Sequence, residues 1–468
     1  MNNKSDENKG QSIRNKISFL LISFYSGLCV ISDLGVKYYF KDQKKVDTTL
    51  LTKILSLFKI PYVIKPLYGL LIDFFPICGY KKKSYLFICF FINIISWYIF
   101  MCSNNHLYIA IISQLLVNTS LSFTTVIGSA IQVEMSKMYE NKKEGEKSSD
   151  LLSQYFITKS IGTLIPSIFK GFLIEKYTND IIFYISGLIS IFIFISGIIL
   201  VEDKINPKKI RLKLKSNKNN QPLISNVIEE EDNNNNNNNN DNKLGQILNL
   251  IKDKNVIVLL VIIFILESSP SSVSPLFYYE TNVLGLNPKD LGLIDLVSQI
   301  SIIVVIVIYN YYFRSFNFKL ITFFVKISMF LIYCLICMLI MKKTQEFISD
   351  FYLVTFATSL HAGLKSLGQL PYSLLAIQFS PLNLKATTYS LCIFSCYLGN
   401  LFADYIDYGL SIYFNVSHYN FENLGTLVFI ENVLNVIQLL YIFAIPIKFF
   451  SQKKSEITEK KRISTEKK

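Results

Sequence analysis

Several ionisable or strongly polar residues lie within long apolar runs of the sequence, where a charge is costly. An ionised side chain at the centre of a bilayer costs about 2.5–3.5 kcal/mol on insertion scales, so each one needs a partner or a polar cavity. Such residues suit the binding of anions and protons better than bond-breaking chemistry. The candidates for substrate binding or coupling within these runs are Asp33, Lys65, Lys159, Glu267, His361, Lys365 and Gln369.

Lys65 is near the middle of the second apolar run, beside Pro66, which loosens the backbone. Its ammonium group could bind a carboxylate of a substrate or pair with Asp33 in the first run. Asp33 is then this partner, a proton-binding acid or a solvated residue at the outer end. Small polar residues flank Lys159, which indicates either a cavity or a close helix contact. Lys170 is nearer the outer end of its run, where we expect it to snorkel toward water.

The segment Glu267-Ser-Ser-Pro-Ser-Ser-Val-Ser-Pro275 interrupts the seventh apolar run. A proline inside a membrane helix frees backbone carbonyls, which is tolerated where they line a cavity. Glu267 is therefore our candidate for the coupling acid of the second half. The alternative is an interhelical pair, for which Asp295 and Lys326 are the available partners.

His361, Lys365 and Gln369 recur every four residues and so share one face of a helix. This polar stripe predicts a cavity lining, and hydrogen bonding between helices is the alternative. Asp404 and Asp407 also share a face, but near the outer end of an apolar run. We expect these two acids to be solvated.

The composition excludes several classes of protein. Hydrophobic residues make up 51% of the 468 residues and charged residues 17%, against about 25% charged in ordinary soluble domains, so a membrane must bury much of the chain. The net charge of +13 comes from basic clusters between apolar runs, which predicts membrane topology rather than nucleic-acid binding. Eight cysteines within apolar runs and three scattered histidines predict neither disulfides nor a metal site. We find no nucleotide-binding loop or catalytic motif, and we expect no cofactor and no enzyme.

Twelve runs are long enough to cross a bilayer core of about 30 Å, which takes about 20 apolar residues each. The first run has no signal-peptide cleavage site, so we keep it as a helix. An even number of crossings leaves both termini on one side, and the richness of that side in Lys and Arg makes it cytoplasmic. The spans are 17–36, 52–75, 85–103, 107–133, 151–174, 181–201, 256–280, 288–313, 319–341, 348–379, 386–406 and 424–447.

A polar segment, 204–253, divides the chain into two halves and contains eight consecutive Asn residues from position 233. This composition cannot bury a core, so we expect a disordered cytoplasmic linker. The predicted fold is an all-α integral membrane protein, a 12-helix bundle of two six-helix halves that resembles the major facilitator superfamily. Its parts are a cytoplasmic tail at 1–16, bundles at 17–203 and 254–450 on either side of the linker, and a basic cytoplasmic tail at 451–468.

One stretch carries a more specific resemblance. Residues Ile64-Lys-Pro-Leu-Tyr-Gly-Leu-Leu-Ile-Asp73, followed by Pro76-Ile-Cys-Gly-Tyr80 and Lys81-Lys-Lys-Ser-Tyr85, resemble the signature of the folate–biopterin transporter family. Within it, Gly69, Asp73, Gly79 and Lys81 match the general facilitator pattern, in which a helix-end acid facing a basic loop forms a breakable latch. Further similarities occur at 38–42, 276–292, 367–371, 385–389 and 420–424.

The fourth run departs from this family. Thr125 and Ser129 occupy positions where the resemblance leads us to expect acids, and Glu134 alone matches. Asn383 and Lys385 likewise replace an expected Gly and Glu. These changes bear on how the protein couples transport and on its substrate.

The resemblance implies a secondary active transporter that moves folate, pterin or p-aminobenzoate-like compounds by alternating access, driven by protons. Lys65, Lys159 and Lys365 are the inner cations available to an anionic folate tail. The alternatives are a transporter of the same fold for another organic anion, an amino acid or a nucleoside, and a transport-inactive receptor or assembly protein. The expected partners are the small-molecule substrate, protons and the lipid bilayer, without nucleic acid. The plasma membrane is the expected location, with a plastid membrane as the alternative.

Overall fold

The computed structural model describes residues 2–103, 106–140, 147–177, 179–202, 204, 254–313, 318–341, 349–379 and 385–444. Over these residues the chain is all-helical, with one isolated bridge between Ile77 and Tyr80. The predicted linker, apart from Lys204, and the predicted C-terminal tail lie outside the described residues.

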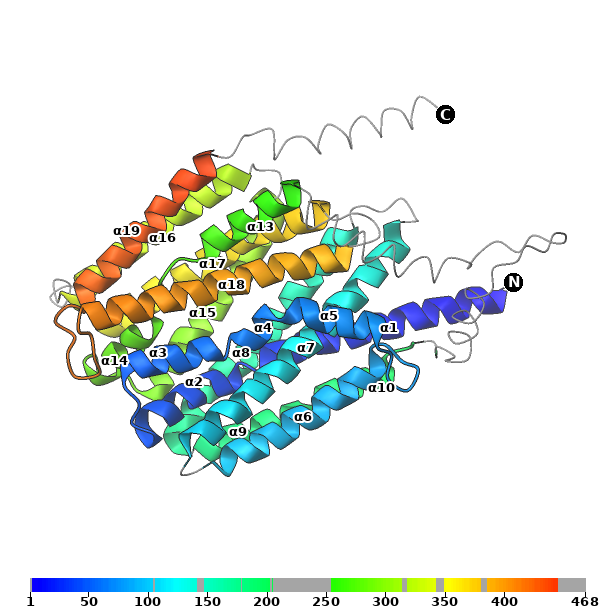
Figure 1. The fold of residues 1–468 in the computed structure, drawn as a ribbon, viewed down its shortest axis with the longest axis horizontal. Helices are drawn as coiled ribbons and strands as arrows, with labels where there is room; N and C mark the ends of the chain where they lie inside the picture. The colour runs from blue at the N-terminus through cyan, green and yellow to red at the C-terminus, as the bar shows by residue number, and fades with distance from the viewer. Residues whose placement is uncertain are drawn as a thin grey trace, which may run out of the picture.

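The first half comprises the helices before the linker, and three of its crossings, the first, second and sixth, are interrupted (Figure 1). The second crossing is divided among three helices, because Pro61 and Pro66 cannot donate to a helical ladder. The helices are α1 (Asn2–Leu28), α2 (Ile31–Tyr38), η1 (Tyr39–Gln43), α3 (Thr48–Leu57), α4 (Ile60–Val63), α5 (Lys65–Phe74), α6 (Lys83–Met101), α7 (Leu107–Glu140), α8 (Lys147–Lys176), α9 (Asn179–Ile189) and α10 (Ile191–Ile199).

The second half has one major interruption, between α13 and α14, where Pro270 lies among serines. Its helices are α13 (Lys254–Glu267), α14 (Val273–Asn282), α15 (Pro288–Ile308), η2 (Tyr309–Phe313), α16 (Phe318–Ile340), α17 (Asp350–Phe379), α18 (Lys385–Tyr413) and α19 (Leu424–Ala444).

The predicted fold class is confirmed. Nine helices in the described part of the chain are long and apolar enough to cross a membrane. The other three predicted spans, 256–280, 348–379 and 386–406, fall on the broken pair α13–α14 and on α17 and α18. These three crossings carry the polar residues that lower their hydropathy.

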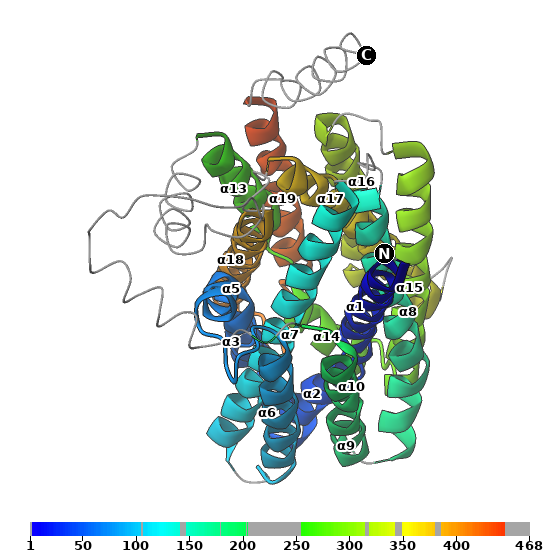
Figure 2. The same cartoon turned by 90° about the vertical axis from the view of Figure 1, so that its right-hand side faces the viewer.

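A hydrophobic cluster joins the two halves at one end of the molecule. It contains Phe40 and Leu51 of the first half together with Tyr278, Val416 and Leu424 of the second. Helix α8 also lies beside α15, and α3 beside α18, across the same boundary (Figure 1, Figure 2). We call this boundary, at the end where η1 and the loop after α18 lie, the outer seam, and it is closed in this structure.

Helices α1 and α8 cross at a contact that requires glycine. A Cβ atom at Gly27 would lie 2.3 Å from the backbone oxygen of Lys159 and 2.9 Å from Cα of Gly162. The small residues around Lys159 therefore provide a close helix contact.

Gly27→Ala should destabilise the first half by about 1–3 kcal/mol, because backbone atoms that cannot move aside occupy the space that the methyl group needs. Gly409→Ala is the matched control, since a Cβ atom there meets nothing within 4 Å. The thermal unfolding of both variants, purified in the same detergent, tests this. Equal melting temperatures would contradict the close contact.

Candidate functional site

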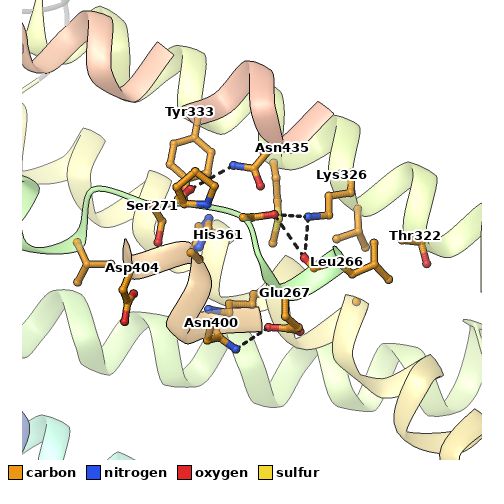
Figure 3. Close-up of a pocket in the computed structure, with 18 of the residues that line it drawn as sticks. Leu266, Glu267, Ser271, Thr322, Lys326, Tyr333, His361, Asn400, Asp404 and Asn435 are labelled. Atoms are coloured by element: carbon orange, nitrogen blue, oxygen red, sulfur yellow. Dashed lines mark hydrogen bonds between the residues drawn. The ribbon is translucent and has the colours of Figure 1, made fainter. Parts of the chain in front are cut away.

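A cavity opens in the second half, with about 860 Å³ of space including the part open to solvent. The break between α13 and α14 forms one wall, and α16, α17, α18 and α19 supply the others (Figure 3). Lys59, which belongs to the first half, also lines the cavity. Its principal polar residues are Glu267, Ser269, Ser271, Lys326, His361, Lys365, Asn400, Asp404 and Asn435.

Lys326 holds the broken end of α13. Its ammonium group donates to the backbone oxygen of Leu266 at 3.2 Å, to Ser269 Oγ at 2.8 Å and to Gln438 Oε1 at 2.9 Å (Figure 3). A cation at a helix C-terminus is favourable because the last carbonyls there carry partial negative charge. The buried Lys326 therefore compensates for the backbone bonds that are lost near Pro270.

Glu267, the last residue of α13, lines the cavity and accepts a hydrogen bond from Asn400 Nδ2 at 3.1 Å. It also interacts electrostatically with Lys326. Of the two partners that the sequence offered for Glu267, the structure thus brings Lys326 near. Asp295 forms an ion pair with Lys170 instead.

The polar stripe of α17 reaches the cavity in part. His361 and Lys365 line it, whereas Gln369 is not among the lining residues. The His361 ring packs edge-on against Tyr333 with 5.3 Å between centroids, and in the described structure its buried Nδ1 has no hydrogen-bond partner. The Lys365 side chain is exposed, so its charge is available inside the cavity.

Lys65 lies outside this cavity, at the boundary between the halves. Its ammonium group is 5.1 Å from the ring centroids of both Tyr62 and Tyr397, which stack on each other at 4.9 Å. Two aromatic faces from opposite halves thus stabilise one buried cation. Lys159 is close enough to interact with it electrostatically.

Asp33 lies among the charges of Lys170, Asp295 and Lys159 rather than beside Lys65. Lys170 is 2% exposed and forms its ion pair with Asp295 across the two halves. The prediction that Lys170 snorkels was therefore wrong. Helix α8 packs closely against α15 at this position, since a Cβ atom at the neighbouring Gly171 would lie 2.4 Å from the backbone oxygen of Pro288. The ammonium group of Lys170 is therefore held between the two helices.

The signature stretch forms a structured loop. Cys78 and Gly79 both have positive φ values, 54° and 83°, and the backbones of Ile77 and Tyr80 exchange two hydrogen bonds of 3.0 Å. This tight turn places the basic loop at the start of α6. Gly69 has open space around it, and the side chain of Asp73 lies outside the described residues.

Two acids other than Asp73 engage this loop. Glu134 forms an ion pair with Lys82. Glu202 accepts backbone N–H groups of Lys81 at 2.9 Å and of Lys82 and Lys83 at 3.0 Å each. The carboxylate of Glu202 therefore occupies a helix N-terminus, where anions are stabilised, and no local pattern had indicated this contact.

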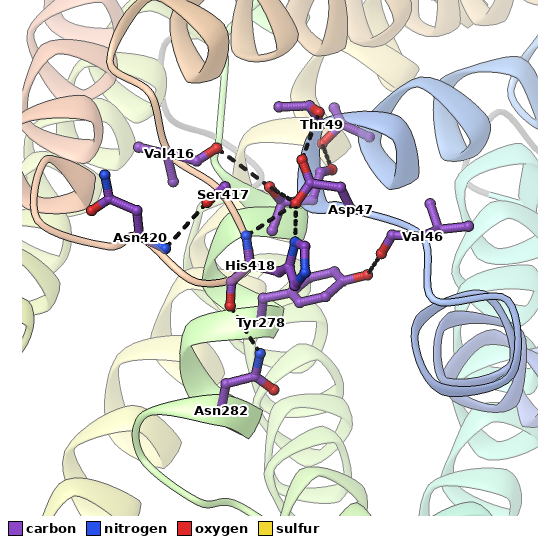
Figure 4. Close-up of polar contacts among 11 residues, drawn as sticks. Val46, Asp47, Thr49, Tyr278, Asn282, Val416, Ser417, His418 and Asn420 are labelled. Atoms are coloured by element: carbon purple, nitrogen blue, oxygen red, sulfur yellow. Dashed lines mark hydrogen bonds and ion pairs between the residues drawn. The ribbon is translucent and has the colours of Figure 1, made fainter.

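Polar contacts close the outer seam. Asp47 Oδ1 accepts the backbone N–H of His418 at 3.0 Å and lies 2.5 Å from its ring Nδ1 (Figure 4). Tyr278 donates to the backbone oxygen of Val46. Deeper along the same boundary, Lys59 Nζ lies 2.6 Å from Asp404 Oδ2. Sequence analysis missed Asp47, His418 and Lys59 because nothing local marks residues whose partners are more than 300 positions away.

Asp47 lies outside the membrane-spanning helices, and its ionised carboxylate accepts the hydrogen bonds that join the two halves at the closed seam. Partial burial disfavours its charge, but hydrogen bonds from the His418 side chain and backbone outweigh burial and lower the pKa of Asp47. A lowered pKa means that this contact is present above the ordinary carboxyl pKa and is lost as the pH falls through the lowered value.

Comparisons with known proteins agree with one another. Residues 26–465 match the model of the BT1 family. "Folate transporter 1" of Plasmodium falciparum is 25% identical over 453 residues, which cover 95% of this chain and 81% of that protein. The "Folate-biopterin transporter" of Synechocystis sp. is 22% identical over 439 residues, covering 92% and 81%.

Solved transporter structures share the fold. The nucleoside transporter NupG has a TM-score of 0.63 at 13% identity, covering 92% of this chain and all of that one. A D-xylose-proton symporter also reaches 0.63 at 10% identity, covering 93% and 98%. At such identities the likeness establishes the fold alone.

Lys59→Ala should shift the protein roughly tenfold toward an open outer seam, because a hydrogen bond to a charged group contributes about 1.5–3 kcal/mol and partial exposure of Lys59 puts it at the lower end. Spin labels at the exposed positions Tyr108 and Tyr419, in a background without Cys78 and Cys102, would report the opening as a longer distance. Lys53→Ala, an equal loss of charge on α3, is the control. Equal distances in the two variants would refute the role of Lys59.

Asp47→Asn should loosen the seam at neutral pH, whereas acidifying the unmodified protein to about pH 5.5 should leave this contact intact, because that pH is above the ordinary carboxyl pKa of about 3.9. The same pair of spin labels measures both. Opening of the unmodified seam at that pH without opening in the variant would contradict the assignment.

Proposed function

The chain belongs to the BT1 family, and from that membership we propose that it is a secondary active transporter of folate- or pterin-type compounds that works by alternating access. It is a multi-pass membrane protein with the fold of major facilitator transporters. The names of its relatives support the substrate class, and the cavity in the second half supports a binding role.

The observation that carries the proposal is a polar cavity built on a broken membrane helix. Irregular backbone is tolerated at membrane depth where it borders a cavity or is buried in protein, and transporters use such breaks to hold substrates. The break at Ser268–Ser272 borders this cavity. Polar side chains from both ends of the break and from the neighbouring helices converge on this space, as they do in small-molecule sites.

The lining suits a pterin ring with an anionic tail. Tyr333 offers an aromatic face for a planar ring, and Asn400, Asn435 and Glu267 offer amide and carboxylate groups to its edge. Lys365 supplies a cation that a folate carboxylate can reach. Lys65, buried between two tyrosines, is a second candidate cation on the side of the first half.

Transport requires the outer seam to open and close around this site. A ligand changes that equilibrium only by interacting differently with the two states. Lys59 lines the cavity and also spans the seam through Asp404, so a bound substrate near Asp404 would alter the balance. We infer that a proton gradient drives the cycle, with substrate and proton as its partners.

For topology, we propose that both termini are cytoplasmic. The start of α1 and the end of α19 lie at the end of the molecule away from the outer seam (Figure 1). The basic loop at Lys81–Lys83 belongs to the same end, as the positive-inside rule requires. The proposed location is the plasma membrane, with an organellar membrane as the alternative.

Labelled folate and labelled pterin should both enter a transport-deficient host that expresses the protein, each competed by the unlabelled other. Lys365→Met should lower folate uptake roughly tenfold and pterin uptake less, because one charge-assisted hydrogen bond to a carboxylate contributes about 1.5–3 kcal/mol. The control is Lys254→Met, an exposed lysine outside the cavity.

Surface labelling would establish that each variant reaches the membrane. Failure of the inserted, unmodified protein to take up either compound would overturn the substrate class. An equal effect of Lys365→Met on both compounds would overturn the assignment of the carboxylate to Lys365.

A further inference from the structure

Two buried carboxyl groups meet between α18 and α19, on the outer side of the cavity. Asp407 is 2% exposed and Glu431 is 1% exposed, and their side chains lie within hydrogen-bonding reach of each other. We call them the carboxyl pair. The expectation that Asp407 is solvated was wrong, and Glu431, although it lies inside the predicted span 424–447, was not among the predicted candidates.

The polar surroundings of the carboxyl pair are specific. Glu431 Oε2 accepts the backbone N–H of Ser272 at 2.9 Å and its hydroxyl group at 2.6 Å, and Ser411 Oγ donates to Asp407 Oδ1 at 3.3 Å. The other oxygen of Glu431, Oε1, is buried without a donor in the described structure. A protonated neighbouring carboxyl would supply the missing donor, because a carboxylic acid donates one O–H.

The charged and titratable groups that face the pair do not neutralise it. Asp404 on α18 adds a further negative charge, and Tyr333 faces the pair from α16. Lys59, from the first half, is engaged with Asp404. No ion pair among the described residues joins a cation to Asp407 or Glu431.

Two adjacent buried carboxylates that form no ion pair with a cation cannot both be ionised while water is excluded from them, because each repels the other and neither is solvated. Building on the function proposed above, we propose that Asp407 and Glu431 share the proton that drives transport. The proton adds to the pair from the outer solution and later leaves through the cavity, so the pair alternates between one shared proton and none.

The outer seam controls access to the pair. Asp404, which holds Lys59, is one helical turn from Asp407 on α18. Opening the seam removes Lys59 and admits water, so the pair can lose or gain its proton. Closing the seam removes that water and requires the proton to be present. Protonation therefore favours closure at the outer side, which is the direction that uptake needs.

Ser272 connects the pair to the substrate cavity. It is the last residue of the break, and its neighbour Ser271 lines the cavity. Asn435 reinforces the connection by donating to the backbone oxygens of Glu431 at 3.1 Å and of Pro270 at 3.5 Å. Loss of the proton would alter the hydrogen bonds between Glu431 and Ser272. Because Ser272 belongs to the break, the adjacent cavity wall would change as well.

Glu267, which the sequence favoured as the coupling acid, has a different environment. Asn400 donates to it and Lys326 interacts with it electrostatically, so its negative charge is compensated without a proton. The carboxyl pair lacks such compensation. Replacing a carboxyl group by an amide should therefore have different effects at the two sites: the pH response of uptake should be lost at Glu431 and kept at Glu267.

Glu431→Gln is the decisive variant, because the amide oxygen can still accept both groups of Ser272 while its NH₂ donates to Asp407. We expect uphill accumulation to be lost and the ratio of uptake at about pH 5.5 to that at about pH 7.5 to fall to about one, with substrate counterflow within about twofold of the unmodified protein. The exposed Glu422→Gln is the matched control and should keep the full pH response.

Glu267→Gln, measured in the same assay, tests the alternative that Glu267 is the coupling acid. If Glu431→Gln still accumulates substrate against its gradient, the proposal is overturned. The same holds if Glu267→Gln flattens the pH response and Glu431→Gln does not.

A measurement without substrate separates this inference from the proposed function. Infrared spectra of the protein in nanodiscs at about pH 7.5 should contain the carbonyl band of a protonated carboxylic acid, which Glu431→Gln shifts and the double variant with Asp407→Asn removes. A band that behaves in this way without folate or pterin uptake would refute the substrate and support the pair. A spectrum without such a band, from folded protein, would refute the pair.

Discussion

A break in a membrane helix must find hydrogen-bond partners within the protein, because the hydrocarbon core offers none. The segment Ser268–Ser272 obtains them from two sides. Lys326 holds the carbonyl end of α13, and Glu431 holds the amide end that begins α14. The cavity and the carboxyl pair both follow from this requirement, since each borders the same irregular backbone. The second half is therefore organised around one local disruption rather than around its regular helices.

The closed outer seam has a different physical basis. Apolar side chains from both halves form one cluster there. Two ion pairs, Lys59–Asp404 and Lys170–Asp295, and the hydrogen-bonded contact between Asp47 and His418 join residues of opposite halves. A buried charge whose partner leaves must be rehydrated or neutralised. Separation of the halves is therefore feasible only if water enters the seam, which ties the conformational change to the ionisation of groups beside it.

The apolar runs predicted the fold because a bilayer imposes length and hydropathy on each crossing, and the prolines and serines after Glu267 predicted the broken helix for the same reason. Pairing across the halves was not predictable, since Lys170 and Asp295 are 125 positions apart and each resembles an ordinary helix-end charge. Asp407 was misjudged because the predicted span stopped at 406. Helix α18 continues to Tyr413, which puts Asp407 more than one turn inside the helix.

The fourth crossing helps explain why ionisable chemistry gathers in the second half. Thr125 and Ser129 replace acids that the family resemblance led us to expect, and their hydroxyl groups donate to backbone oxygens of their own helix at 2.7 Å and 2.9 Å. Neither position can carry a transported proton, because a hydroxyl group does not ionise at physiological pH. The proposed coupling to protons therefore requires carboxyl groups elsewhere in the chain. Asp407 and Glu431, buried against each other beside the helix break, meet that need.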